Sequence, residues 1–237
     1  MALGTATVPY DMRFDAGRIC LDLLSTSHPE ERLNSLAPLC AWITGSGLVP
    51  PGTPLAHADA SWLVAFHELR GWVGRLVRDC LAEAPRPHDP ALARPHDPAL
   101  ARPHDPALAR PHDSALARPH DSALARPHDP ALARLNDLAR TPPPAPRAVR
   151  GEDGTLVREL AGPPECAALL AAVARDAVDL LTDPGARASL RRCEGDNCPI
   201  VYLDSSRGHR RRWCSSEVCG NRERVARHRR RAALARA

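Results

Sequence analysis

Apolar residues in the first third of the chain recur with helical spacing. Those between positions 36 and 43 lie three, four and seven residues apart, which places them on one face of a helix that Gly45 and Gly47 end. A wider stripe between positions 62 and 80 keeps this period for about five turns, with Asp59 as its N-cap. Residues 18–24 are compatible with either a strand or a helix. This part of the pattern predicts a helical core.

Two more helices are expected in the second half of the chain. Leu132, Leu135 and Leu138 are in step on a short helix. Pro164 begins a longer one, whose apolar face ends before the Asp-Pro-Gly turn at residues 183–185.

Residues 148–160 predict a β-hairpin that turns at Asp153-Gly154, a dipeptide typical of such turns. Together these elements predict an α+β fold, with a helix-dominated N-terminal domain that carries a small hairpin.

An internal repeat interrupts this domain at residues 86–133. The unit Arg-Pro-His-Asp-Pro-Ala-Leu-Ala occurs six times, with Ser114 and Ser122 in place of the second proline in two copies. Proline at every unit prevents a continuous helix, and an advance of about 80° per unit leaves no shared apolar face. The last unit continues directly into the short helix near Leu135. We therefore predict one native unit, five units added by tandem expansion, and a flexible insert at residues 86–129.

The repeat also places a histidine every eight residues, and such His-rich tracts can bind Ni²⁺ or Zn²⁺. Metal binding by the repeat is therefore an alternative to a neutral insert. Its candidate ligands are His88, His96, His104, His112, His120 and His128.

Charge is distributed unevenly along the chain. All 32 basic residues are arginine, and 13 of them lie in residues 191–237 beside only 5 acidic residues, whereas the rest of the chain is net acidic. Such asymmetry indicates a polyanion-binding end. No secretory signal and no membrane-length apolar run are visible, so we expect a cytoplasmic protein whose thiols stay reduced.

Four of the eight cysteines are clustered. Cys193 and Cys198 form one pair, and Cys214 and Cys219 form a second pair after a loop of fifteen residues. Two close pairs joined by a loop can supply the four thiolates of a tetrahedral zinc site. A fourfold shell leaves no open position, so the pattern predicts one structural Zn²⁺ and no catalytic metal. Buried thiols or two disulfides are the alternative.

The other cysteines lack ligand spacing and are interpreted as small buried hydrophobic residues. They are Cys20, Cys40, Cys80 and Cys166.

The segment around the second cysteine pair is rich in arginine, whose planar fork donates two parallel hydrogen bonds to phosphate. We expect a helix to begin near Cys219, with Val218, Val225 and Ala232 packed inward and Trp213 on the finger core. An unpartnered, solvated tail is the alternative. The candidate DNA-binding residues are Arg207, Arg210, Arg211, Arg212, Asn221, Arg222, Arg224, Arg227, Arg229, Arg230 and Arg231.

Two parts of the chain resemble known families. Cys-Gly-Asn-Arg at positions 219–222, with the other three cysteines, Asp204, Ser206, Arg207, Arg212 and Trp213, resembles the CGNR zinc finger. The N-terminal part is similar to the stress-induced transcription regulator (ABATE-type) domain. That likeness rests on Phe14, Gly17, Leu21, Asp22, Thr26, Leu36, Leu39, Trp42, Gly47, Leu48, Leu135 and Asn136.

The resemblance implies a bacterial transcription regulator in three parts. Residues 1–85 and 130–190 would form a regulatory or sensor domain, residues 86–129 the insert, and residues 191–237 a treble-clef-like finger with a basic C-terminal helix. DNA is the expected partner, and a homodimer would suit paired half-sites. The alternative is a zinc-stabilised module that binds an acidic protein. No nucleophile motif, phosphate loop or paired carboxylates are visible, so we do not expect an enzyme.

Overall fold

The computed structural model describes residues 12–83 and 129–234. The predicted insert at residues 86–129 lies almost wholly outside these ranges, as do all six histidines of the repeat. The proposals of a flexible insert and of a histidine metal site therefore stay predictions.

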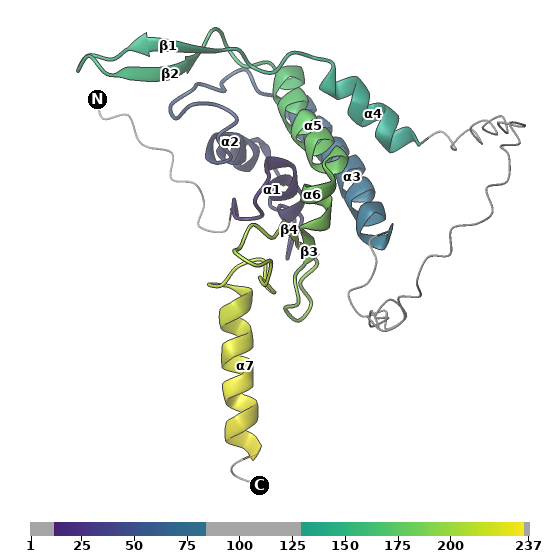
Figure 1. Ribbon diagram of the computed structural model, residues 1–237. Coiled ribbons are helices and arrows are strands. Elements are labelled where there is room, and N and C mark those ends of the chain that lie inside the picture. The colour runs from purple at the N-terminus through teal and green to yellow at the C-terminus, as the bar shows by residue number, and fades with distance from the viewer. Residues whose placement is uncertain (1–11, 84–128, 235–237) are drawn as a thin grey trace, which may run out of the picture. The chain divides into compact units, whose positions relative to one another are not determined.

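Three helices form the centre of the N-terminal part: α3 (Ala60–Glu83), α4 (Pro130–Ala139) and α5 (Cys166–Thr182). They lie side by side in Figure 1 and share a core of fully buried aliphatic side chains. α2 (Leu36–Gly45) packs on α3, where Trp42 meets Phe66 edge to face with ring centroids 5.9 Å apart. The helical periodicity therefore predicted α2, α3 and α5 correctly.

The ambiguous stretch at residues 18–24 is the helix α1 (Ile19–Ser25), and five of its seven residues are buried. A distant carboxylate stabilises its first turn: Asp176 on α5 accepts a hydrogen bond from the backbone N–H of Cys20 at 2.9 Å and pairs with Arg18 at 2.8 Å. The group that satisfies this helix terminus lies 156 residues away, so local sequence could not decide between strand and helix.

The short helix α4 forms as predicted, but its three leucines are not equally buried. Ala131 and Leu135 are buried, whereas Leu132 is 46% exposed. Leu132, although in step with Leu135, therefore does not share its buried face. The small side chain of Ala131 occupies the contact instead, which allows α4 to approach its neighbours closely.

The predicted hairpin consists of β1 (Pro146–Arg150) and β2 (Leu156–Leu160), paired antiparallel with Val149 opposite Val157. Gly154 adopts φ +80° in the turn, a conformation that favours glycine. After α5, Asp183 caps the short helix α6 (Pro184–Ala188) by accepting the Gly185 N–H at 2.8 Å. From the sequence only a turn was expected there.

The C-terminal part contains a second antiparallel pair, β3 (Leu190–Arg192) with β4 (Val201–Leu203), and then the helix α7 (Cys219–Leu234). The chain is thus helix-rich with a small hairpin, as predicted, and it has a second short antiparallel pair in the finger. In the described residues no helix is long and apolar enough to cross a membrane.

Candidate metal centre

The first cysteine pair lies in the turn between β3 and β4. Cys193 donates its backbone N–H to Ile200 at 2.9 Å, and Cys198 donates to Gly195 at 3.1 Å, which closes the turn. Asn197 takes φ 54°, in the left-handed region that asparagine tolerates. A Cβ on Gly195 would lie only 3.1 Å from the Cβ of Cys219, so the close approach of the two cysteine pairs requires glycine there.

The second pair lies where the loop after β4 enters α7. Cys214 is buried in the loop, and Cys219 is the first residue of the helix. Ser215 holds the turn between these two cysteines, because its hydroxyl accepts hydrogen bonds from the N–H groups of Glu217 and Val218 at 3.2 Å. A strand hairpin carrying one pair and a helix start carrying the other make a treble-clef-like finger.

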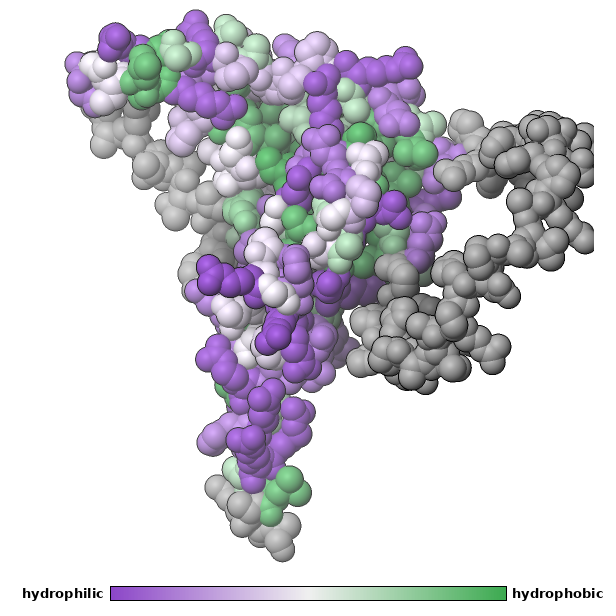
Figure 2. All heavy atoms as spheres, viewed as in Figure 1, coloured by the Kyte–Doolittle hydropathy of each residue, from purple (hydrophilic) through white to green (hydrophobic). Residues whose placement is uncertain are grey.

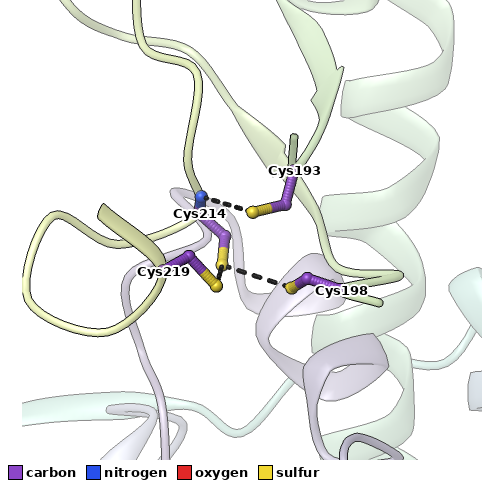
Figure 3. Close-up of side chains that lie close together, drawn as sticks. All are labelled: Cys193, Cys198, Cys214 and Cys219. Carbon is purple, nitrogen blue, oxygen red and sulfur yellow. Dashed lines mark hydrogen bonds between the residues drawn. The ribbon is translucent and has the colours of Figure 1, made fainter. Parts of the chain in front are cut away.

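Figure 3 shows the four sulfur atoms pointing toward a common centre. All four lie within 4.8 Å of one another, with Cys214 Sγ 3.7 Å from Cys198 Sγ and 3.6 Å from Cys219 Sγ. Four thiolates around zinc at about 2.3 Å would lie about 3.8 Å apart, whereas a disulfide needs about 2.05 Å. All eight cysteines are free. The donor set and spacing therefore fit one structural Zn²⁺ and exclude the disulfide alternative.

The surroundings of the four thiols do not favour loss of the proton from all of them together. Burial raises the pKa of the Cys214 thiol to about 11 and also raises the pKa of Cys219, in both cases with a contribution from neighbouring cysteines. At Cys193 burial acts in the same direction, but N–H groups of Cys214 and Gly195 at 3.3 and 3.4 Å lower its pKa. A bound divalent cation supplies the charge that allows all four to be thiolates.

Beside this centre, Arg13 crosses from the N-terminal segment to the finger. Its guanidinium donates to Cys214 Sγ at 3.2 Å and to the Cys214 carbonyl oxygen at 3.0 Å, while Asp15 accepts a further bond at 2.8 Å. Four thiolates on Zn²⁺ carry a net charge of −2, and Arg13 lies where it offsets part of that charge.

The backbone of the same N-terminal segment pairs with the finger strand β4. The Ala16 carbonyl oxygen accepts the Leu203 N–H at 2.8 Å. Gly17, at φ +90°, lies so close to Leu203 that an added Cβ would be 3.2 Å from its Cβ. The N-terminal part and the finger are therefore packed together within one compact unit.

Two family models match the chain. The ABATE model, described as "Putative stress-induced transcription regulator", matches residues 17–127 and 114–184. The chain belongs to the ABATE family. The two ABATE matches overlap at residues 114–127, inside the repeat, as expected when extra units interrupt one domain. The CGNR zinc finger model matches residues 189–232. No curated protein matches the sequence.

In this ABATE-family chain the loop between β4 and Cys214 is organised by Asp204, which is fully buried. Its carboxylate accepts the N–H and hydroxyl of Ser206 at 3.0 and 2.6 Å and the N–H of Arg211 at 3.1 Å. The loop therefore has a defined path between the two cysteine pairs.

Arg211, a candidate DNA-binding residue, is used inside this loop. Its guanidinium stacks 4.5 Å from the centre of the Tyr202 ring and donates to the carbonyl oxygens of Trp213 at 2.9 Å and Asp15 at 3.1 Å. It also bonds the Cys214 carbonyl oxygen. Sequence reasoning missed this role and that of Arg13, because their partners are set by the packing of distant segments.

The remaining candidate DNA-binding residues are exposed, and some have protein partners. Arg212 pairs with Glu194 at 2.6 Å, Arg230 pairs with Glu223 at 3.7 Å, and Arg224 donates to the Ser216 carbonyl oxygen at 3.2 Å. Six of the others are exposed and make no side-chain hydrogen bond or ion pair within the described ranges: Arg207, Arg210, Arg222, Arg227, Arg229 and Arg231.

Of the residues of α7 whose burial is described, only Cys219 and Gly220 at its start are buried. Val218 is 39% exposed and Val225 is 43% exposed, so the expected inward packing of these valines was wrong. Trp213 is half-buried against Gly220, as predicted. Figure 2 shows an almost continuous hydrophilic surface over α7.

The prediction that the other four cysteines are buried is confirmed for Cys20 alone. Cys40, Cys80 and Cys166 are only half-buried, and none of the four joins the cluster.

Proposed function

We propose that this chain is a zinc-dependent, DNA-binding transcription regulator whose helix α7 lies in the major groove. The observation that carries this proposal is the arrangement of arginine on an exposed helix that begins at a zinc ligand. Its 16 residues extend about 24 Å, and the major groove is wide enough for such a helix.

Five of the six arginines of α7 form two stripes on opposite sides, and the sixth, Arg230, lies on the same face as its partner Glu223. At about 100° per residue, Arg222 and Arg229 fall at nearly the same angle, while Arg224, Arg227 and Arg231 cluster about 180° away. A helix in the major groove has a phosphate backbone on each side. Two opposite basic stripes suit these two backbones, whereas a flat acidic protein surface would need only one.

The face between the stripes has the properties of a base-reading surface. Asn221, Val225 and His228 lie on it, all exposed. Asparagine can bond adenine with two hydrogen bonds, and an apolar side chain such as valine can contact a thymine methyl group. The opposite face carries Glu223 and Ala226, which line a hollow with the first cysteine turn.

Zinc would act here by fixing the start of α7. Cys219 is both a ligand and the first residue of the helix, and Trp213 packs on Gly220 beside it. Without metal the buried thiols would lose their common centre, and α7 would lose its fixed attachment. We assign the N-terminal domain the role of sensing a signal or forming a dimer.

The test is binding of the full chain to a pool of genomic DNA fragments at several salt concentrations. Retention of a few fragments, lost with Cys214→Ser, would support a regulator, and the bound stoichiometry would reveal a dimer. A double variant with Arg222→Ala and Arg229→Ala should reduce the salt slope by about 2, since each phosphate contact contributes about 0.9. Arg158→Ala, an exposed change on β2, should have no effect.

Sequence-blind retention would contradict a specific regulator. No retention at low salt would contradict DNA binding altogether and leave an acidic protein as the partner of these arginines.

A further inference from the structure

A cavity of about 530 Å³ lies between α3 and the first cysteine turn of the finger. One face of α3 forms one wall, and the turn with the start of β4 forms another. The volume is in the range of small-molecule sites. Its α3 lining consists of His67, Arg70, Gly71, Gly74, Val77 and Arg78.

Apart from the two cysteines, the titratable side chains of this cavity are basic. Arg70, Arg78 and Arg192 line it together with two histidines, and none of its lining residues is acidic. Arg70 is already held by Glu31 and by Thr26 Oγ1 at 2.8 Å. Arg78 and Arg192 form no ion pair within the described residues, so their guanidinium groups remain available for a ligand.

The cavity also offers apolar contact. Leu24 from α1, Val77 from α3 and Ile200 from the finger reach it from three elements. An anionic group near Arg78 and Arg192 and an apolar body against these side chains would use both parts of the lining.

A glycine in the middle of α3, Gly71, lines this space. Gly71 costs the helix about 1 kcal/mol relative to alanine. Packing does not require it, because an added Cβ would meet nothing within 4 Å. Its neighbour Gly74 differs, since a Cβ there would lie 3.3 Å from Leu24 and from Arg78. Gly71 lines the cavity, so a large side chain at this position would take up part of the cavity space.

We propose that this cavity binds a small organic anion, a carboxylate or phosphate on an apolar body, and that this ligand is the signal of the regulator. The regulatory part of the inference rests on the proposed function, whereas the binding itself does not. Cys193 and Cys198 lie in the cavity wall, so a ligand there would touch α3 and the zinc turn together.

The negative charge of the zinc-bound thiolates opposes an anion, and the neighbouring arginines favour one. A matched pair of probes shows which prevails. We would measure binding of 2-naphthoate and of its neutral counterpart, 2-naphthalenemethanol, to the zinc-loaded full chain by equilibrium dialysis without DNA. The expected result is one naphthoate site per chain with at least tenfold preference over the alcohol. Inorganic phosphate, which lacks the apolar body, should bind at least tenfold more weakly than naphthoate.

Variants then locate the probe. Arg78→Ala combined with Arg192→Ala should weaken naphthoate binding at least tenfold, and Gly71→Leu should abolish it by filling the cavity. Gly71→Ala and Arg75→Ala, on the same helix, should leave binding within about twofold. Circular dichroism and zinc content would confirm that each variant is folded.

Equal binding of both probes, or naphthoate binding unchanged in folded Gly71→Leu, would overturn the proposal, as would no naphthoate binding at all. Because DNA is absent from this assay, any of these results would leave DNA binding untouched. Conversely, a failure to bind DNA would remove the regulatory meaning and leave a measured anion site.

Discussion

Replacing Arg13 with alanine is expected to weaken zinc binding although Arg13 is not a ligand. The guanidinium contacts Cys214 twice, at its Sγ and at its carbonyl oxygen. The bond to Sγ is stronger when the sulfur is a zinc-bound thiolate than when it is a neutral thiol. Its loss therefore destabilises the metal-bound state more than the metal-free state.

The size of the effect follows from the 3.2 Å contact. A hydrogen bond to a charged group contributes about 1.5–3 kcal/mol, and water entering the site replaces part of it, because the Arg13 side chain is 19% exposed. A net loss of about 1.4–2.8 kcal/mol corresponds to a 10- to 100-fold lower zinc affinity, which is typical for groups that support metal ligands.

The assay is competition for zinc between the full chain and a chromogenic chelator at constant pH. Arg13→Lys keeps the charge without the planar fork and should fall between wild type and Arg13→Ala. Arg158→Ala, remote from the finger, should match wild type. If Arg13→Ala lowered only the unfolding temperature and left zinc affinity unchanged, Arg13 would join the two parts of the chain without acting on the thiolate.

Three further predictions concern packing, pH and the cysteine turn. Leu135→Ala should lower the free energy of unfolding by about 2–5 kcal/mol in urea titrations, and Leu132→Ala on the exposed face of α4 by less than about 1. Burial raises the pKa of Asp22 to about 7 from 3.8. Between these values the folded carboxyl holds a proton that the unfolded chain releases, so the free energy of unfolding falls as the pH rises from about 4 to about 7. Thermal unfolding of Asp22→Asn should lack that part of the pH dependence, and a parallel pH profile in both proteins would refute it. Gly195→Ala should weaken zinc binding in the same competition assay, because its Cβ would press on both atoms of the Cys219 side chain at 3.1 and 3.2 Å, and unchanged affinity would show that the turn can expand.

Elements whose pattern is decided locally were predictable from sequence. α3 and α5 carry long apolar stripes, and the hairpin has its Asp-Gly turn, so periodicity and turn chemistry placed them correctly. α1 was undecided because the carboxylate of Asp176 that satisfies its first turn comes from α5. α6 was missed because its five residues have no apolar periodicity.

At the metal centre too, features set by local sequence were predictable and those set by tertiary contacts were not. Cysteine spacing alone selected the four residues that the structure brings together. Spacing could not separate Arg211, which the fold uses internally, from Arg222, which stays exposed, because both look alike in a basic run. Which arginines are free depends on tertiary contacts such as that with Asp15.

The start of α4 has a genetic consequence. Pro130 and Ala131 belong to the last repeat unit, so the repeat itself supplies the first turn of a core helix. Each unit is eight codons long, and a slip of the replicating strands by whole units preserves the reading frame. Whatever the copy number, the unit before Arg134 still contains an aspartate, then a proline or serine that can begin a helix, and then the alanine that becomes buried. Lineages can therefore differ in the number of units while the first turn of this helix keeps the same sequence.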